Sequence, residues 1–334
     1  MSEEKISRRG FIQTTSAVAA AVGVGACKKT GEVVSEKPGN KPDDTGPAGT
    51  GQRARPGTSE KHNPRFAPPQ PRKSGRSKVV LVRDTDVLDD RNRVRVRVLN
   101  RMLDQAVTEL TGHKTADEAW QSLLRPQDVL GVKSNVWQYL RTPVALEKAI
   151  FDRARKVGIA ADRIHTDDRG ARKSLARCTA LVNARPLRSH HWAGVGGLLK
   201  NYIMFDAEPW KYHPDSCADL GALWNLPTVQ GKTRLNVLVM LTPLYHGRGP
   251  HHFSSSYLWP YKGLIVSRDP VAADRVGLEI LRAKRKEKFG RERPFATRTH
   301  HVELADTRHG VGVADLKRID LVTLGWKEGL LLPG

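Results

Sequence analysis

Residues 79–110, VVLVRDTDVLDDRNRVRVRVLNRMLDQAVTEL, hold the pattern that indicates the fold class. The stretch opens at 79–82 with a short apolar and mostly β-branched run, which is typical of a buried strand. Apolar residues then recur at the spacing of one helix face, at Val98, Met102, Leu103, Ala106, Val107 and Leu110. A strand followed by an amphipathic helix predicts an α/β unit.

The same alternation continues along the chain. Strand-like runs follow at 128–133, 163–166, 180–182, 235–241 and 263–266. Two predicted helices begin with a capping residue and a proline, Thr142-Pro143 and Asp269-Pro270; the first is expected to end at Gly158. The second is expected to run through Leu281 into a basic segment. We therefore expect an α/β fold with a mixed or mainly parallel sheet flanked by helices, in a single large domain over residues 79–334.

Residues 1–27 have the layout of a bacterial export signal. Arg8 and Arg9, followed by Gly-Phe-Ile, resemble the twin-arginine motif, and the Ala- and Val-rich run at 14–26 is too short to span a bilayer stably. The run ends in VGAC, which resembles a lipobox with Cys27 as the acylated residue; a plain signal-peptidase site is the alternative. We expect export by the twin-arginine machinery to the periplasmic or cell-envelope face, with a lipid anchor at Cys27 holding the protein on a membrane.

Residues 28–78 are rich in proline, glycine and charge, and Phe66 is their one aromatic residue. Such a segment buries too little apolar surface to offset its conformational entropy, so we expect a disordered linker. The chain carries 56 Lys and Arg against 35 Asp and Glu, a net charge of +21. This charge favours an anionic lipid, polymer or small ligand as partner, with a merely solvated basic surface as the alternative. Nucleic acid is not expected, because the basic residues are scattered and an exported protein meets little of it.

Besides Cys27, the chain has two cysteines, Cys178 and Cys217. They can pair in an oxidising compartment or both stay reduced. Two thiols are too few for an iron–sulfur cluster held by four cysteines.

Lys200 lies in the stretch 189–204, SHHWAGVGGLLKNYIM, among apolar neighbours. A buried lysine must be neutralised, paired or covalently engaged, and its pKa should fall. The glycine run at 194–197 permits close backbone approach to a ligand. We predict that Lys200 faces one cleft with Lys133, Asn135 and at least one of His190, His191 and His213. The alternative is a lysine whose amine reaches solvent from a helix end.

Polar residues also follow several predicted strands, where the sites of α/β sheets are usually found. Lys133 and Asn135 are candidates for binding a substrate carboxylate or a cofactor, or for capping a loop. Asp168 is a candidate for cofactor binding, either by holding a metal or by orienting a histidine. Neither a Gly-x-Gly-x-x-Gly motif after the first strand nor a phosphate loop is present, so nucleotide binding has no support.

Five motifs occur in order: GVKSN at 131–135, HTDD at 165–168, LVNARPLRSHHWAGVGGLLKN at 181–201, GLIVSRDPVAADRVG at 263–277 and HHVELADTRHGVGVADLKRI at 300–319. Together they resemble the domain of unknown function 362 family over nearly all of 79–325. The chain departs from that pattern at Gly194, where the family commonly has threonine. It also lacks the four-cysteine segments of some members, which removes an electron-transfer role.

The surroundings of Lys200 also resemble, more distantly, those of the nickel-pincer lactate racemases. This resemblance implies a cofactor tethered to Lys200, acid/base work by His190 or His191, and nickel bound by His213. His190, His191 and Lys200, with the adjacent Asn201, form the predicted catalytic set.

A plain metal site for nickel, zinc or iron is the competing prediction, with His213, His165 and His246 as ligands. Adjacent histidines on an extended strand point to opposite faces, so each pair offers one easy ligand. The chain has no H-x-H, H-E-x-x-H or C-x-x-C motif. Most of its histidines are therefore expected to be structural.

These patterns favour a metal-dependent enzyme, or one with a lysine-linked cofactor, of isomerase, racemase or redox type and acting on a small anionic substrate. The alternative is a tethered binding protein for an anionic ligand or polymer, without catalysis.

Overall fold

The computed structural model describes residues 64–247 and 253–332. The predicted export signal with Arg8 and Arg9, the predicted anchor Cys27, and residues 28–63 of the predicted linker lie outside the described residues.

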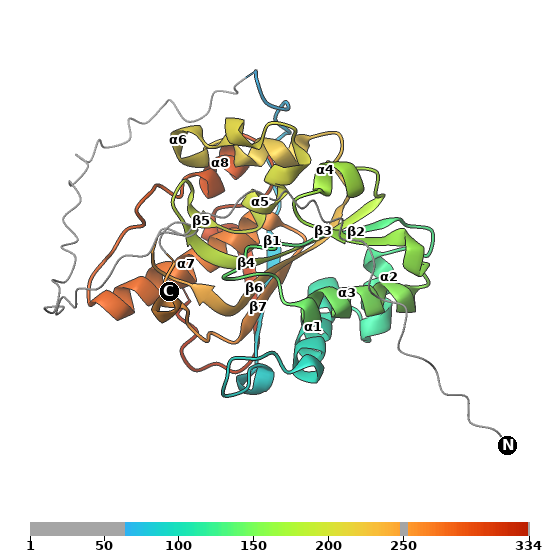
Figure 1. The fold of residues 1–334 in the computed structure, drawn as a ribbon, viewed down its shortest axis with the longest axis horizontal. Coiled ribbons are helices and arrows are strands. Elements are labelled where there is room, and N and C mark those ends of the chain that lie inside the picture. The colour runs from blue at the N-terminus through green and yellow to red at the C-terminus, as the bar shows by residue number, and fades with distance from the viewer. Residues whose placement is uncertain (1–63, 248–252, 333–334) are drawn as a thin grey trace, which may run out of the picture. The chain divides into compact units, whose positions relative to one another are not determined.

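In the described part of the chain, eight strands form one sheet in the order β3-β2-β4-β6-β7-β1-β8, with β5 paired to β4 (Figure 1). Strands β3, β2, β4 and β6 are parallel to one another, and so are β1 and β8. Strand β7 runs antiparallel to both β6 and β1, and β5 runs antiparallel to β4. The sheet is therefore mixed and mostly parallel, as predicted. The strands span Ser77–Arg83 (β1), Leu130–Lys133 (β2), Ile164–Asp167 (β3), Ala180–His190 (β4), Gly194–Gly196 (β5), Thr233–Leu244 (β6), Gly263–Ser267 (β7) and Ile319–Gly325 (β8).

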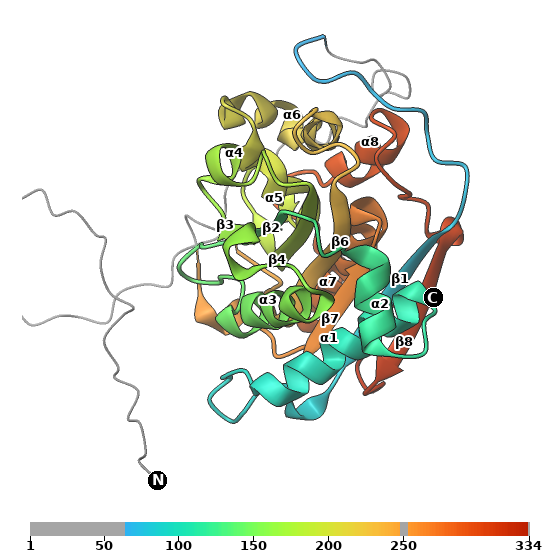
Figure 2. The ribbon, with the colours of Figure 1, turned by 90° about the vertical axis from the view of Figure 1, so that its right-hand side faces the viewer.

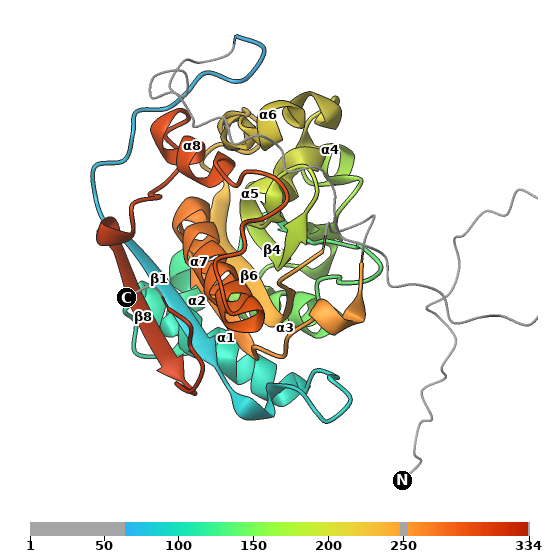
Figure 3. The same ribbon diagram turned by 90° about the vertical axis from the view of Figure 1, so that its left-hand side faces the viewer.

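Helices cover both faces of the sheet. Figure 2 shows α1, α2 and α3 together on one face, and Figure 3 shows α7 lying along the other. Val80 and Val82 pack with the first group of helices, whereas Val79 and Leu81 pack with the second. Because successive strand residues point to opposite faces, a strand buried on both sides must be apolar throughout, as residues 79–82 are.

The helices span Val96–Thr111 (α1), Ala116–Leu123 (α2), Val144–Val157 (α3), Ala171–Ser174 (α4), Leu198–Asn201 (α5), Pro214–Cys217 (α6), Pro270–Phe289 (α7) and His301–Thr307 (α8). Short 3-10 turns lie at Thr85–Val87, Ala161–Arg163, Tyr202–Phe205, Pro209–Tyr212, Leu220–Asn225, Ser255–Tyr257 and Leu316–Arg318.

The two predicted helix caps have different outcomes. Asp269 caps α7 as predicted, because its Oδ1 accepts the backbone N–H groups of Val271 and Ala272. The predicted cap at Thr142 is wrong, and Pro143 occupies that position instead. The Thr142 hydroxyl donates to the Ala184 carbonyl at 3.0 Å and accepts the Asn135 N–H at 3.0 Å. Thr142 therefore ties the loop after β2 to β4.

Strand β4 is much longer than the predicted strand at 180–182. It continues through Pro186 to His190 and turns back as β5. Proline is tolerated there because the pairing with β6 shifts register between Pro186 and Arg188, an irregularity at which a missing N–H is least costly. The histidine pair therefore lies at the end of a central strand.

Contacts with the domain begin before residue 79. The Phe66 ring lies 4.9 Å from that of Tyr212, and Arg72 forms an ion pair with Asp306 at 2.6 Å. The last part of the predicted linker is thus attached to the domain. Cys178 and Cys217 are both buried and free of a disulfide. Among the residues described, no helix is both long and apolar enough to cross a membrane.

Candidate functional site

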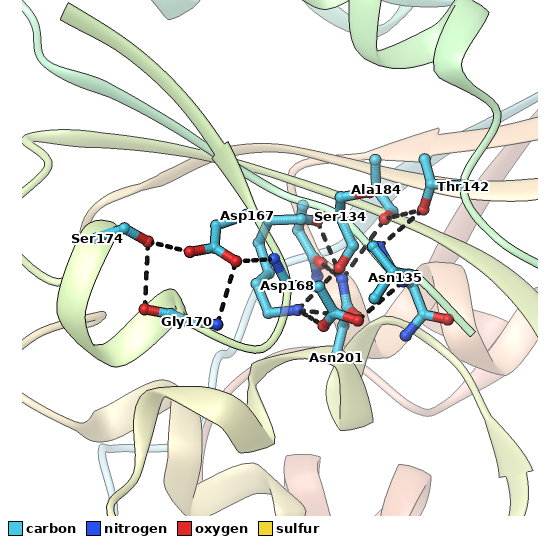
Figure 4. A network of polar contacts seen from close by, with 12 residues as sticks. Ser134, Asn135, Thr142, Asp167, Asp168, Gly170, Ser174, Ala184 and Asn201 are labelled. Carbon is cyan, nitrogen blue, oxygen red and sulfur yellow. Dashed lines mark hydrogen bonds and ion pairs between the residues drawn. The ribbon is translucent and has the colours of Figure 1, made fainter. Parts of the chain in front are cut away.

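The carboxyl ends of β2 and β3 lie side by side, where Lys133 is paired in register with Asp167 of β3 and with Asn183, the fourth residue of β4. Asn201, the last residue of α5, joins these strand ends (Figure 4). Its side-chain amide donates to the Lys133 carbonyl at 3.1 Å and to Asn183 Oδ1 at 2.8 Å. The Lys-Asn segment singled out in the sequence is therefore fastened to the end of β2 by the asparagine.

Lys133 is completely buried and fully paired. Its amine donates to Asp168 Oδ1 at 2.5 Å and to the Ser134 carbonyl at 2.8 Å. Burial lowers the pKa of Lys133 to about 8, against the opposing effect of Asp168. Burial acts to raise the pKa of Asp168, but Lys133 outweighs it and holds that pKa below its usual range.

Lys200 is 4% exposed, so the prediction of a buried lysine is confirmed. Its amine lies 3.6 Å from Cys217 Sγ and 6.0 Å from the centre of the Trp192 ring. No carboxylate of the described residues forms an ion pair with it. Burial lowers its pKa to about 8; the Cys217 thiol opposes this, and the charges of Arg185 and Arg188 add to it.

Arg185 and Arg188, both on β4, are two further buried cations of this site. Arg188 donates to Asn135 Oδ1 at 3.1 Å and lies over the Trp137 ring at 4.1 Å. The Nε atoms of both arginines are buried with no hydrogen-bond partner among the described residues. Burial lowers the pKa of Arg185 to about 10 and moves that of Arg188 in the same direction.

The sequence interpretation missed these two arginines because it ended the strand at residue 182. The signal that would have found them is the Arg-Pro-Leu-Arg run continuing an apolar strand. A charge in a central strand is buried and must have a partner or a ligand.

The predicted acid/base histidines lie beside this basic cluster. The backbone N–H of Trp192 donates to His190 Nδ1 at 3.2 Å, so the proton of the neutral His190 imidazole is on Nε2. Burial lowers the pKa of His190 well below its ordinary value, and the charge of Lys200 adds to the effect. The rings of His190 and His191 stack at 4.8 Å, against the expectation of opposite faces, because the chain leaves the strand at His190.

His213 and His301 complete the histidines near Lys200. The His213 ring packs against Trp192 in a tilted arrangement, with ring centres 3.9 Å apart. Burial first, and then Lys200, lowers the pKa of His213 to about 4. His301 is fully buried and was not predicted. Neither of its ring nitrogens has a partner in the part of the chain that the structure describes. Burial and then Lys200 lower its pKa to about 3, so the ring is neutral at physiological pH.

The predicted metal ligands His165, His213 and His246 are not brought together. His165 lies on β3, where it is paired in register with Gly131 of β2. His246 Nδ1 lies 3.0 Å from a guanidinium nitrogen of Arg285. A cation beside His246 disfavours a metal there. Residues 64–247 and 253–332 contain no group of three or more His, Cys, Asp or Glu side chains that could hold a metal ion.

Two glycines of the 194–197 run are needed for close approach. A Cβ at Gly196 would lie 3.0 Å from Arg185 Nη2 and 3.3 Å from His190 Cδ2, so these two side chains approach the same backbone point. A Cβ at Gly197 would lie 2.2 Å from the carboxylate of Asp274. That carboxylate accepts the N–H groups of Leu198 and Leu199, and burial raises the pKa of Asp274 to about 7. Asp274 thereby fixes the turn that presents Lys200.

The other side of Lys200 is formed by a left-handed segment. Asp215, Ser216 and Cys217 have φ angles of 48°, 55° and 64°. Non-glycine residues in this region cost about 1 kcal/mol or more each. The segment brings the Cys217 thiol against the Lys200 amine.

Two open cavities lie away from this cluster. One of about 940 Å³ is lined by Arg83, Arg101 and Leu324, and one of about 620 Å³ by Arg282, Arg298 and Glu303. Three of the arginines there are paired with carboxylates: Arg101 with Asp84, Arg282 with Glu279 and Arg298 with Asp215. We therefore place the candidate site at the buried cluster, where the basic groups outnumber the acidic ones.

No family model, no curated protein and no solved structure matches this chain. The resemblances to the domain of unknown function 362 family and to the lactate racemases therefore stay predictions. The chemistry of the site has to be inferred from its own residues, which can bind an anion, offer a poorly solvated amine, and transfer a proton through neutral imidazole.

Proposed function

We propose that the domain binds a small, multiply charged anion between Arg185, Arg188 and Lys200, next to the Lys133–Asp168 pair. The observation that carries this proposal is the surplus of buried positive charge. Asp168 is paired with Lys133, and Asp274 is engaged by the backbone of α5. Buried cations without counter-charges are costly, so a ligand that supplies negative charge would stabilise the cluster.

The chemistry of the cluster favours carboxylate or phosphate groups. Guanidinium groups bind such oxyanions through paired N–H donors, and the Nε donors of Arg185 and Arg188 have no partner among the described residues. We propose a small ligand, because these side chains are buried. This favours a small ligand over the polymer that the basic composition also allowed.

We further propose that the protein is an enzyme whose reactive group is Lys200, in preference to a metal-dependent one. Burial lowers the pKa of Lys200, His190 and His301, so the imidazoles are neutral at physiological pH, which supports acid/base chemistry on the bound anion. The N-terminal motifs support export by the twin-arginine route and anchoring at Cys27, so we place this activity at the cell envelope.

Thermal unfolding of the full chain tests the anion site. Sulfate, phosphate and oxalate, at constant ionic strength, should raise the Tm well above that in chloride, since a ligand that binds the folded state stabilises it. Arg185→Met should remove the effect, whereas Arg76→Met, at an exposed arginine paired with Asp320, should leave it intact. Equal Tm values in all four salts would contradict the proposal.

A further inference from the structure

Lys200 differs from the other cations of the site in what surrounds its nitrogen. Lys133 has an Asp168 oxygen at 2.5 Å, and Arg188 has an Asn135 oxygen at 3.1 Å. The Lys200 amine instead lies 3.6 Å from the Cys217 thiol, and a thiol is a weak acceptor. The amine therefore keeps its lone pair available whenever it is neutral.

Several polar side chains surround the glycine turn that precedes Lys200. Arg185 Nη2 and His190 Cδ2 both lie within 3.3 Å of the point where a Gly196 Cβ would be. His301 has two buried ring nitrogens without partners among the described residues, and its charge state is coupled to Lys200 and Arg185. Arg185 and His190 thus converge beside the glycine turn that leads into α5, the helix that carries Lys200. An anion alone would not engage the amine as a nucleophile.

We infer that Lys200 captures the carbonyl carbon of a small oxo acid as an imine, while Arg185 and Arg188 hold the acid group. This inference rests on the proposed anion site and names its ligand class. An oxo acid is the simplest ligand that offers both parts, because its carboxylate and its carbonyl carbon are adjacent.

The reaction balances without a redox partner. The neutral Lys200 amine adds to the carbonyl carbon, the C–N bond forms, and the carbonyl oxygen takes up a proton to give a carbinolamine. The nitrogen then loses its proton, the hydroxyl group leaves as water after protonation, and the C=N bond is complete. A neutral imidazole such as His301 takes each of the two protons from nitrogen and, as imidazolium, passes it to the oxygen, so that both leave with the water. His190, whose Nε2 carries its proton, donates a hydrogen bond to that oxygen.

The electrostatics of the pocket supports this role. Burial and the neighbouring arginines lower the pKa of Lys200 to about 8, so near pH 7.5 its neutral fraction exceeds that of an exposed lysine roughly a hundredfold. Trp192 is 45% exposed and lies over the amine, which places the reactive nitrogen one aromatic ring below the surface. A ligand of a few atoms can reach it where a larger one would not.

Borohydride trapping tests the inference on the full-length protein. Glyoxylate is added at pH 7.5, sodium borohydride reduces any imine to a stable secondary amine, and the adduct is located by peptide mass spectrometry. Labelling at Lys200 should exceed that at Lys148, an exposed lysine, about tenfold or more, because far more of the buried amine is neutral. Excess oxalate should suppress labelling at Lys200 and leave Lys148 unchanged.

Three variants make the result specific. Lys200→Arg keeps the positive charge and should still bind oxalate but form no adduct. Lys148→Met should leave the Lys200 adduct unchanged. Cys217→Ser should still be labelled at Lys200; loss of the adduct in a folded Cys217→Ser protein would show that the thiol captures the carbonyl and would overturn the inference.

Failure of this inference differs from failure of the anion site. If oxalate raises the Tm but glyoxylate labels Lys200 no more than Lys148, the imine is excluded and the anion site stands. If oxalate has no effect and Lys200 is not labelled, both proposals fall.

Discussion

Lys133 and Lys200 lie at the same edge of the sheet, are almost equally buried, and have a pKa lowered to the same value of about 8. Their surroundings differ. Lys133 has a carboxylate and a carbonyl oxygen as partners, whereas Lys200 has a thiol and an aromatic face. A pKa lowered to about 8 therefore does not by itself distinguish an amine that is held as a cation from one that can react. The partner decides between the two roles.

The largest expected effect is on the Lys133 side. Asp168→Asn leaves the Lys133 ammonium buried without a counter-charge, and we expect a loss of about 3–5 kcal/mol in the free energy of unfolding. Urea denaturation measures this, with Asp152→Asn as the control, because the exposed Lys148–Asp152 pair should contribute less than about 1 kcal/mol. A loss no larger than that of the control would mean that the two lysines are not differently paired.

Removing the Lys200 amine should stabilise the folded protein instead of destabilising it. Its pKa is 10.5 in the unfolded chain and about 8 in the folded protein, so between these values the unfolded chain binds more protons. The free energy of unfolding of the wild type therefore rises as the pH increases from 8 to 10.5. Well below pH 8 the Lys200 ammonium is fully charged in the folded protein, and this gain in stability is absent. Lys200→Met should be more stable than wild type by about 2 kcal/mol at pH 7, since it removes a buried unpaired charge.

That stability difference should shrink to nothing by about pH 10.5, and denaturation of both proteins from pH 7 to 10.5 measures it. The matched variant Lys133→Met should be destabilised at pH 7, because it leaves Asp168 buried without its cation. If Lys200→Met loses as much stability as Lys133→Met, the Lys200 ammonium is paired with a counter-charge in the folded protein, contrary to the proposal.

The smallest expected effect concerns the left-handed segment beside Lys200. Glycine adopts positive φ without strain, so Ser216→Gly should stabilise the protein by about 0.5 kcal/mol after the higher entropy of the unfolded chain is included. Ser122→Gly, inside α2, should destabilise it by up to about 1 kcal/mol. Thermal unfolding of both variants distinguishes the two signs, and a destabilised Ser216→Gly protein would argue against a strained turn.

The sequence allowed prediction of what local patterns determine. Apolar periodicity gave the alternation of strands and helices, and the Asp269-Pro270 pair gave the start of α7. The apolar neighbours of Lys200 gave its burial. Each of these features depends on residues within one or two turns of the chain.

What failed depended on contacts between distant segments. The length of β4 was missed because Pro186 indicates a strand end, and the register shift that accommodates it exists only against β6. Arg185 and Arg188 were missed for the same reason, and His301 because its burial depends on the packing of α8 against distant segments such as α7. The metal set failed because His246 lies against Arg285 of α7.

The position of β1 in the sheet has a consequence for biosynthesis. In Figures 2 and 3, β1 lies beside β8, and its pairing partners are β7 and β8. The first strand of the domain therefore has no neighbour until residues 263–325 have been made, and such long-range pairing is slow and exposes strand edges. A transporter that threads an unfolded chain would leave this step to the far side of the membrane. The twin-arginine route, proposed here from Arg8 and Arg9, carries folded proteins and lets the sheet close, with any bound ligand, before the crossing.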